Sequence, residues 1–297
     1  MFFNGEAGMA IVSIISMVRN EERYIRDAVT SILNQENVDL ELIVVDDYST
    51  DSTFAILQEL SCLDNRLKVF RNPGNGKVAA FRFGCNKATG DYFAFFAGDD
   101  LMPKGSLFSR YEASRIIPSP SVLLSKIQVL SDDLRINGLI IPKQKGKGNP
   151  SGASIMIDRA AAKYMLDIPE VLPNEDTWMD LCIRFINVLN VESHDTVACL
   201  WRVHSGNSIT IRQGFDEFSN KFALRMNALL IFREKYFNIL SQASINEIDA
   251  LIECEAYRRK GSVLGILMSR ASISDKIRFI FYSRRILFLV RKMIKSI

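Results

Sequence analysis

The feature that most constrains the fold is a repeated alternation of short apolar runs with segments of helical periodicity. It begins with IVSIISMV (11–18), which precedes apolar residues at helical spacing up to residue 35, and three further units follow up to about residue 117. Parallel strands that are joined by helical crossovers produce this alternation. The sequence therefore predicts an α/β fold, with a mostly parallel sheet flanked by helices. Within it, we expect Ser49 or Thr50 to cap the second helix and Pro103 to lie in the first turn of the fourth.

Composition excludes several classes of protein. The five cysteines are scattered, and none forms a CxxC pair, which argues against a disulfide framework or a zinc site. A net charge of +3 is too small to indicate a nucleic-acid partner. The sequence lacks the roughly 18 to 20 consecutive apolar residues that a membrane span requires, and its N-terminus does not resemble an export signal. We expect a cytoplasmic protein with reduced thiols.

Polar clusters follow three of the predicted strands. Open α/β sheets bind ligands at the carboxyl ends of their strands, so clusters in successive units favour a ligand site over three solvated turns. In AFFAGDD (94–100), two adjacent carboxylates end a buried strand, where each raises the cost of ionising the other, and a bound cation would offset that cost. The clusters are Arg19, Asn20 and Glu21; Asp46, Asp47 and Ser49; and Asp99 and Asp100.

The order of these motifs resembles the N-terminal half of family 2 glycosyltransferases, which have the nucleotide-sugar-binding GT-A fold. The resemblance rests on IVSIISMVRNEERYI, ELIVVDDYSTDST, the GNGK segment and DYFAFFAGDD, and continues in PNEDTWMDLCIRF (173–185) and WRVHSGNSIT (201–210). It implies a GT-A domain over residues 10–212. The remainder, 213–297, has helical periodicity and is expected to form a C-terminal helical extension.

The resemblance implies a divalent cation, Mn²⁺ or Mg²⁺, which would neutralise the diphosphate that leaves when the glycosidic bond breaks. Asp99 is the first expected ligand and Asp100 the second. His204 is expected to be a third ligand or a diphosphate contact. The family's cluster often reads Asp-x-Asp-Asp, and Ala97 replaces the leading Asp here, which leaves less acidic coordination.

By the same resemblance, the nucleotide lies along the ends of the first two strands. Asp47 would accept a hydrogen bond from the donor base, with uracil the default, and Lys77 would approach the base or the phosphates. The alternatives are that Asp46 and Asp47 only cap the following helix and that Lys77 is solvated. Further donor contacts, mostly through the backbone, are expected from Met17, Val18, Arg19 and Glu21, together with the carboxylate of Asp99.

Two carboxylates open a predicted helix whose apolar positions begin at Trp178. Carboxylates at a helix N-terminus are favourable for electrostatic reasons alone, by about 0.3 to 1 kcal/mol. An inverting transfer also needs a base that takes the proton of the acceptor hydroxyl. From the motif order we expect Asp176 to be that base and Glu175 to orient it or the acceptor.

The C-terminal segment is strongly basic. Residues 276–297 carry seven basic residues and no acidic one, and they are expected to form an amphipathic helix that lies on an anionic membrane surface or packs on the domain. The apolar residues expected to share one face are Ile277, Ile280, Phe281, Leu287, Phe288 and Ile294.

The sequence thus predicts an inverting, metal-dependent glycosyltransferase that uses a nucleotide-sugar donor, with UDP as the expected nucleotide. The acceptor would be a saccharide or lipid-linked saccharide in surface polysaccharide synthesis, and the protein would be peripheral on the inner face of the membrane. One alternative is a sugar nucleotidyltransferase, although no early glycine-rich loop follows the first strand. The other is a non-catalytic, membrane-associated partner of a glycan assembly complex.

Overall fold

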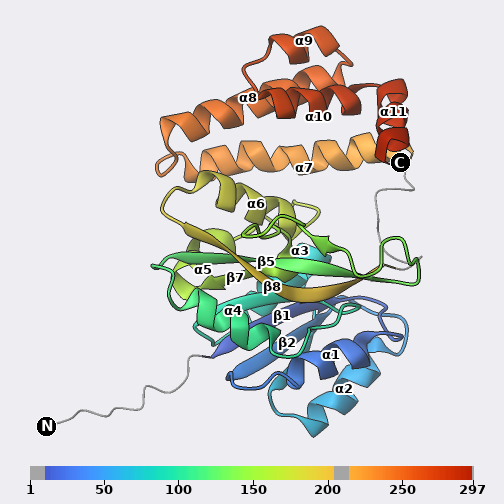
Figure 1. Ribbon diagram of the computed structural model, residues 1–297, viewed down its shortest axis with the longest axis vertical. Coiled ribbons are helices and arrows are strands. Elements are labelled where there is room, and N and C mark those ends of the chain that lie inside the picture. Colours follow the sequence, from blue (N-terminus) through green and yellow to red (C-terminus); the bar gives the residue numbers. More distant parts are fainter. Residues whose placement is uncertain (1–10, 204–213, 296–297) are drawn as a thin grey trace, which may run out of the picture. The chain divides into compact units, whose positions relative to one another are not determined.

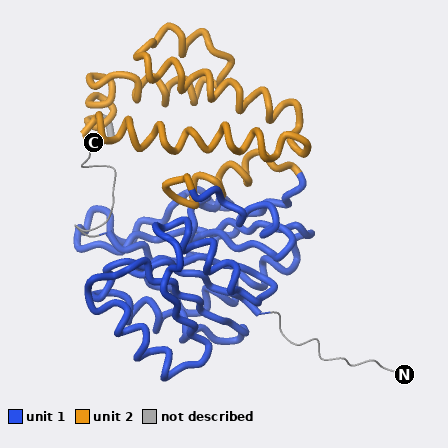
Figure 2. Tube along the Cα trace, turned by 180° about the vertical axis from the view of Figure 1, so that it is seen from behind, with its two compact units in different colours: residues 1–170, 188–205 blue, residues 171–187, 206–297 orange. Residues whose placement is uncertain are grey.

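The structure, a computed structural model, describes residues 11–203 and 214–295. The chain forms two compact units (Figure 2). The first, here called the sheet unit, comprises residues 1–170 and 188–205. The second, the helical unit, comprises residues 171–187 and 206–297. Each unit is described by itself.

Four strand–helix units open the sheet unit, as the apolar periodicity predicts. Strand β1 lies at the centre, with β2 and then β3 on one side and β4 on the other, and all four are parallel. From β1 to β3 the chain adds strands on one side of β1, and it then crosses to the other side to add β4. Open α/β sheets bind ligands at this kind of switch point in the strand order. The elements, most of which are labelled in Figure 1, are β1 (Val12–Val18), α1 (Ile25–Leu33), β2 (Leu40–Asp46), α2 (Thr53–Leu63), β3 (Leu67–Arg71), α3 (Lys77–Lys87), β4 (Tyr92–Ala97) and α4 (Ser106–Ser114).

Two expected helix starts are wrong. Helix α2 is preceded by Ser52 rather than by Ser49 or Thr50, which instead make hydrogen bonds with Asn20 at the end of β1. Helix α4 follows Gly105, whose φ of 74° lies in the left-handed region, so Pro103 precedes the helix. In both places the turn before the helix is longer than the sequence pattern indicates.

The second half of the sheet is mixed. Strand β7 pairs antiparallel with β4 and with β5, while β8 pairs parallel with β5 from Ser121↔Asn190 to Ser131↔Val203. This long pairing carries the end of β8 back to the loop after β4, where Leu101 and Leu200 form an antiparallel bridge. The elements are β5 (Ser121–Ser131), β6 (Ile140–Ile141), η1 (Gly152–Ser154), β7 (Ile155–Asp158), α5 (Arg159–Met165) and β8 (Asn190–Val203).

Side chains of the central strands form the core of the sheet unit. Strand β2 is buried along its whole length, which is typical of a parallel strand covered on both faces. On one face α3 approaches closely at Gly84, where a Cβ atom would lie 2.8 Å from Ile15 Cγ2. This packing holds the strands, and therefore their carboxyl ends, in fixed positions.

The helical unit has an aromatic centre. Trp178 is fully buried, and its ring centroid lies 5.2 Å from that of Phe232 and 5.8 Å from that of Tyr236. No helix among the described residues is both long and apolar enough to cross a membrane. The helices are α6 (Glu175–Phe185), α7 (Phe215–Tyr236), α8 (Gln242–Arg259), α9 (Val263–Met268), α10 (Ile273–Ser283) and α11 (Arg285–Lys295).

The expected single helix over residues 276–297 is wrong. Helix α10 ends before Arg284, whose extended backbone separates it from α11. Phe288, expected on a free apolar face, is 3% exposed and packs against Phe218 with Tyr282. The turn at Arg284 therefore lets two short helices bury aromatic residues that one straight helix could not.

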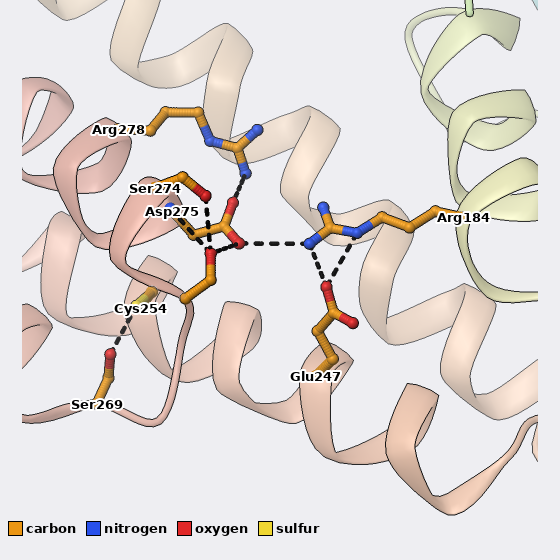
Figure 3. Close-up of polar contacts among 8 residues, drawn as sticks. Arg184, Glu247, Cys254, Ser269, Ser274, Asp275 and Arg278 are labelled. Carbon is orange, nitrogen blue, oxygen red and sulfur yellow. Dashed lines mark hydrogen bonds and ion pairs between the residues drawn. The ribbon is translucent and has the colours of Figure 1, made fainter.

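A network of ion pairs connects three helices of this unit (Figure 3). Arg184 of α6 binds Glu247 of α8 and, at 3.3 Å, Asp275 of α10. Asp275 also accepts hydrogen bonds from Arg278 at 2.9 Å and from the Ser272 hydroxyl at 2.7 Å. Because Asp275 is buried, these charges fix α6 against α8 and α10.

Candidate active site

The ends of β1, β2 and β4 meet at one edge of the sheet. Val18 is level with Asp46 of β2, and Met17 is level with Ala97 of β4. Two of the strand-end loops are also bonded directly: the Asn20 amide donates to Ser49 Oγ at 2.9 Å, and the Thr50 amide donates to Asn20 Oδ1 at 2.8 Å. The three polar clusters therefore lie beside one another, as expected from the strand order.

Three carboxylates form the centre of this edge, here called the acidic cluster: Glu21, Asp99 and Asp100. Burial, and then the charge of Asp99, raise the pKa of Asp100 to about 7. Burial and the charges of Asp99 and Asp51 likewise raise the pKa of Glu21 to about 7. The protein thus holds several acidic groups where their charges repel, which is the arrangement that a bound cation stabilises.

Gly98 makes this close approach possible. A Cβ atom at this position would lie 2.7 Å from Val18 Cγ1 and 3.2 Å from Glu21 Cγ. Only a residue without a side chain lets the end of β4 lie this close to the end of β1. The glycine in AFFAGDD is therefore a requirement of the acidic cluster.

Arg202, at the end of β8, holds the Asp-Asp pair from the other side. Its backbone amide donates to Asp100 Oδ1 at 2.8 Å, and its Nε donates to the carbonyl oxygen of Asp99 at 2.8 Å. The guanidinium lies 4.6 Å from the ring centroid of Tyr24. Arg202 thus positions both residues of the pair, Asp100 through its backbone amide and Asp99 through its side chain.

Asp47, at the end of β2, is buried among polar groups that follow β3. It is 7% exposed, and its Oδ1 accepts hydrogen bonds from Asn72 Nδ2 at 2.6 Å and from the Gly76 amide at 3.2 Å. The turn before α2 is bonded instead by Asp51, whose Oδ1 accepts from the Thr53 amide at 3.0 Å. The alternative that Asp47 caps α2 is therefore wrong.

The other residues expected at the donor site follow the first strand or open α3. Lys77 is exposed at the start of α3, directly after Gly76, which bonds Asp47. Arg19 is exposed after β1, whereas Met17 is half-buried in the strand. The Val18 side chain is in the core, and its carbonyl oxygen accepts from the Asp47 amide at 2.8 Å, so this backbone group positions Asp47.

Glu175 and Asp176 belong to the helical unit, where they open α6 after Asn174 as expected. Glu175 is 5% exposed, and Asp176 is partly exposed. The apolar positions that follow are buried, beginning with Trp178. The hydrogen bond from Thr177 Oγ1 to Asn174 Oδ1, at 2.9 Å, fixes the first turn of this helix. His204 lies outside the described residues.

Sequence reasoning gave no role to Asn72 or Arg202, and it expected Glu21 to contact the donor rather than to join Asp99 and Asp100. Asn72 directly follows strand β3, as Asp47 follows β2, so its position in the sequence could have indicated a place at the same edge of the sheet. For Arg202 no local signal exists, because its contacts with Asp99 and Asp100 span more than 100 positions. They arise only because β8 pairs with β5.

The acidic cluster fits a hard divalent cation. Among the described residues, no three His, Cys, Asp or Glu side chains are placed as a complete metal site. Mg²⁺ and related ions commonly take only one or two protein carboxylates and complete their shell with water and substrate phosphate oxygens. Asp99 and Asp100 suit this role, since both are oxygen ligands and both lie where negative charge is in excess.

Comparisons with known proteins agree with this geometry. The model of the family described as "Glycosyl transferase family 2" matches residues 13–115. An uncharacterized glycosyltransferase of Haemophilus influenzae is 40% identical over 100 residues, which are 33% of this chain and 40% of that protein. The putative teichuronic acid biosynthesis glycosyltransferase TuaG of Bacillus subtilis is 37% identical over 103 residues, which are 34% of this chain and 41% of that protein.

A further relative, the GalNAc(5)-diNAcBac-PP-undecaprenol beta-1,3-glucosyltransferase of Campylobacter jejuni, is 35% identical over 101 residues, or 33% of each chain. The matched segment therefore spans about two fifths or less of these curated relatives. The family-model match, residues 13–115, contains all of β1 except its first residue, strands β2 to β4 and the whole acidic cluster.

Two solved structures share the fold over most of the chain. Residues 1–349 of S. aureus TarS, in complex with UDP, superpose with a TM-score of 0.60 at 22% identity, covering 91% of this chain and 78% of that one. The mannosyltransferase PcManGT from Pyrobaculum calidifontis, in complex with GDP-Man and Mn²⁺, gives 0.55 at 13% identity, covering 97% and 88%. Residues 13–115 therefore match the model of glycosyl transferase family 2, and the chain has the GT-A fold of these solved glycosyltransferases.

Proposed function

We propose that the protein is an inverting, metal-dependent glycosyltransferase that moves a sugar from a nucleoside diphosphate to a saccharide acceptor. The observation that carries this proposal is the acidic cluster, in which Glu21, Asp99 and Asp100 meet at the carboxyl ends of β1 and β4. A bound cation would neutralise the excess of negative charge in this cluster. The cluster lies at the carboxyl ends of the strands, where open α/β sheets bind ligands, so the same cation could bind the diphosphate of the donor.

In this mechanism, Asp99 and Asp100 would hold Mn²⁺ or Mg²⁺, which neutralises the charge that develops on the leaving diphosphate. Arg202 keeps the pair in place through its backbone amide and Nε. Asp176 would take the proton of the acceptor hydroxyl as that oxygen attacks the anomeric carbon, and Glu175 would orient it. His204 remains a candidate third ligand or diphosphate contact.

We propose UDP as the nucleotide of the donor. Asn72 and Gly76 both donate to Asp47 Oδ1, and no hydrogen bond within the described part of the chain engages Oδ2, so that oxygen can accept the N3–H of uracil. Lys77 follows at the start of α3 and would contact the base or the phosphates. Met17, Val18 and Arg19 would line the nucleotide mainly through the backbone. The structural relative TarS was solved with UDP, which supports the same choice.

The acceptor is proposed to be a saccharide, free or lipid-linked, in the synthesis of a surface polysaccharide. The names of two relatives support this class, one a teichuronic acid enzyme and one that acts on an undecaprenol-linked glycan. A lipid-linked acceptor would place the reaction at a membrane, so we propose that the protein is cytoplasmic and peripheral on the inner face of the cell membrane.

Titration calorimetry with UDP, with and without Mn²⁺, tests the donor site. We expect metal-dependent binding that disappears in the double variant Asp99→Asn, Asp100→Asn. The chain provides a matched control in a second adjacent pair, Asp132 and Asp133, which follows β5. Asp132→Asn, Asp133→Asn should bind UDP normally.

Turnover is tested next, by screening UDP-sugars for release of UDP in the presence of acceptor. Asp176→Asn should abolish transfer while UDP still binds, because the base acts on the acceptor and not on the nucleotide. If UDP, GDP and the other nucleoside diphosphates all fail to bind with Mn²⁺ present, the proposal is wrong and a non-catalytic role is favoured.

A further inference from the structure

Exposed apolar residues are concentrated on the last three helices, α9, α10 and α11. Eight of the 22 large apolar residues that are exposed among the described residues lie between Leu264 and Met293. Scattered single exposed apolar residues are normal on a protein surface, whereas a contiguous group indicates a binding surface.

On α11 the exposed apolar residues form one stripe. Ile286, Leu289 and Met293 are 75%, 51% and 60% exposed, and their spacing of three and four residues puts them on the same side of the helix. Phe288 lies on the other side, where it is buried with Phe218. An ordinary surface helix has its charged face opposite its buried face, so this stripe is unusual.

Helix α10 repeats the arrangement. Ile273 and Ile277, one turn apart, are 78% and 50% exposed, while Phe279 and Tyr282 face the interior of the unit. Here too the helix buries one apolar side and presents a second.

The short helix α9 does the same. It buries Ile266 and exposes Leu264, Leu267 and Met268. Helix α9 contacts α10, and α10 contacts α11, so the three stripes belong to neighbouring helices. We call the eight exposed residues the outer stripes.

The segment that carries the outer stripes has almost entirely positive charge, and of its basic residues Arg285 is paired with Asp216 of α7. Residues 260–297 contain nine Lys and Arg residues and a single acidic residue, Asp275. Asp275 is buried and bound to Arg184 and Arg278, so it adds no free negative charge to this surface. Apolar side chains flanked by basic ones are the composition of helices that lie in the interface of anionic membranes.

We propose that the outer stripes of α9, α10 and α11 bind the surface of an anionic lipid bilayer. The apolar side chains enter the acyl boundary, and the basic residues contact the headgroup phosphates. None of these helices is long and apolar enough to cross the bilayer, so the contact is interfacial. The inference deepens the proposed function, because it gives the enzyme a means of meeting a lipid-linked acceptor, but its evidence lies wholly in the helical unit.

Vesicle flotation of the full-length protein, without donor or acceptor, tests the proposal. We expect the protein to float with vesicles of phosphatidylcholine and phosphatidylglycerol, and to float less with pure phosphatidylcholine or at high salt. The variant Ile286→Gln, Leu289→Gln, Met293→Gln should bind at least about tenfold more weakly, because three apolar side chains no longer enter the interface. These side chains are exposed, so the fold should persist, and circular dichroism checks this.

The matched control changes three apolar residues of the sheet unit that are more exposed than those of the stripe variant, Leu63, Ile116 and Leu134, to Gln. It should float as the wild type does. Equal flotation of the stripe variant and the wild type, or no flotation of the wild type, would overturn the proposal.

Sedimentation velocity tests whether the outer stripes bind a second copy of this chain rather than a membrane. If the wild type is a dimer, the stripe variant is a monomer and neither floats, the surface is a subunit interface and the proposal is wrong. The variant Asp99→Asn, Asp100→Asn should float normally, so loss of UDP binding and loss of membrane binding are separate results.

Discussion

Buried carboxylates at the two ends of the parallel strands have pKa values that are shifted in opposite directions. At the amino end, Glu41 of β2 is 5% exposed and accepts hydrogen bonds from Ser13 Oγ at 2.6 Å, Lys68 Nζ at 2.6 Å and the Thr89 amide at 2.6 Å. Burial alone would raise its pKa, but these donors together lower it to about 2. At the carboxyl end, burial and neighbouring charges raise the pKa of Asp100 and Glu21 to about 7.

The difference separates a structural carboxylate from the carboxylates that we propose bind a cation. Glu41 obtains its donors from the chain itself and needs nothing further, so its charge stabilises the fold. Burial and neighbouring carboxylates raise the pKa of Asp100 and Glu21 despite the hydrogen bond from the Arg202 amide to Asp100, so their charges cost stability, and a bound cation would offset that cost. A buried carboxylate is therefore informative about function only when its partners are considered.

The largest expected effect is on catalysis. Replacing Asp99 and Asp100 with Asn should lower kcat/KM by about 10³-fold, since the diphosphate loses its counter-ion in the transition state. The double variant should unfold at a temperature equal to or above that of the wild type when no metal is present, because the repulsion is removed. A rate assay with UDP-sugar and Mn²⁺, together with thermal unfolding, measures both. A fall in unfolding temperature with unchanged kcat/KM would contradict the comparison.

Glu41→Gln should have the opposite effects, with lower stability and unchanged catalysis. The variant loses the charge that Lys68 and the backbone amides stabilise, and its free energy of unfolding should fall by about 2 kcal/mol at pH 7. The kcat of the folded enzyme should not change, because Glu41 lies at the edge away from the nucleotide. Urea unfolding measures the first and an assay below the transition measures the second. Glu59→Gln, an exposed carboxylate in a surface ion pair with Arg26, is the control and should cost less than about 1 kcal/mol.

The acid limit of stability should follow Glu41. Its pKa in the folded state, about 2, is below the ordinary value of 4.5, so its contribution is complete above pH 4.5 and is lost as the pH falls towards 2. The difference in unfolding free energy between the wild type and Glu41→Gln should therefore be constant from pH 5 to 7 and shrink below pH 4.5. Urea titrations at several pH values measure it, and a difference that persists at pH 2.5 would remove Glu41 from this role.

Features of the fold and the site could be predicted from the sequence where the interacting residues are close together along the chain. The four strand–helix units and the clusters at Asp47 and Asp99 follow from local periodicity, and the structure confirms both the units and their meeting at one edge. Glu41 was not identified, because its donors Ser13 and Thr89 lie 28 and 48 positions away. The same reason hides Arg202, whose partner Asp100 is 102 positions distant.

The C-terminal segment shows a different limit. Its basic, apolar composition predicted a membrane-binding helix, but the break at Arg284 contains neither proline nor glycine and has no local signal. Burial of Phe279 and Phe288 in the helical unit sets the break. As a result, the apolar face chosen from the sequence points partly inward, and Ile277 is its only residue that belongs to the outer stripes, which include Ile273 and Ile286 instead.

The smallest expected effect is that of Asp100→Asn on stability, which can be compared directly with that of Glu41→Gln. Asp100 has a pKa of about 7 in the folded state, above its ordinary value of 3.8, so its charge destabilises the fold fully above pH 7 and not at all below about pH 3.8. Asp100→Asn should therefore raise the free energy of unfolding by about 1 kcal/mol at pH 8, and this gain should shrink towards pH 4. The Asn oxygen can still accept from the Arg202 amide, so the substitution changes mainly the charge.

Added Mn²⁺ should reverse that sign. A cation that binds only the folded state stabilises the wild type in proportion to its occupancy, and Asp100→Asn would lose most of this gain. At pH 8 the variant should thus be more stable than the wild type in EDTA and less stable in Mn²⁺, whereas Glu41→Gln should be less stable in both. Thermal unfolding of the three proteins in the two buffers measures this. If Mn²⁺ shifts the wild type and Asp100→Asn equally, the raised pKa of Asp100 reflects burial alone, and the cation must be held elsewhere.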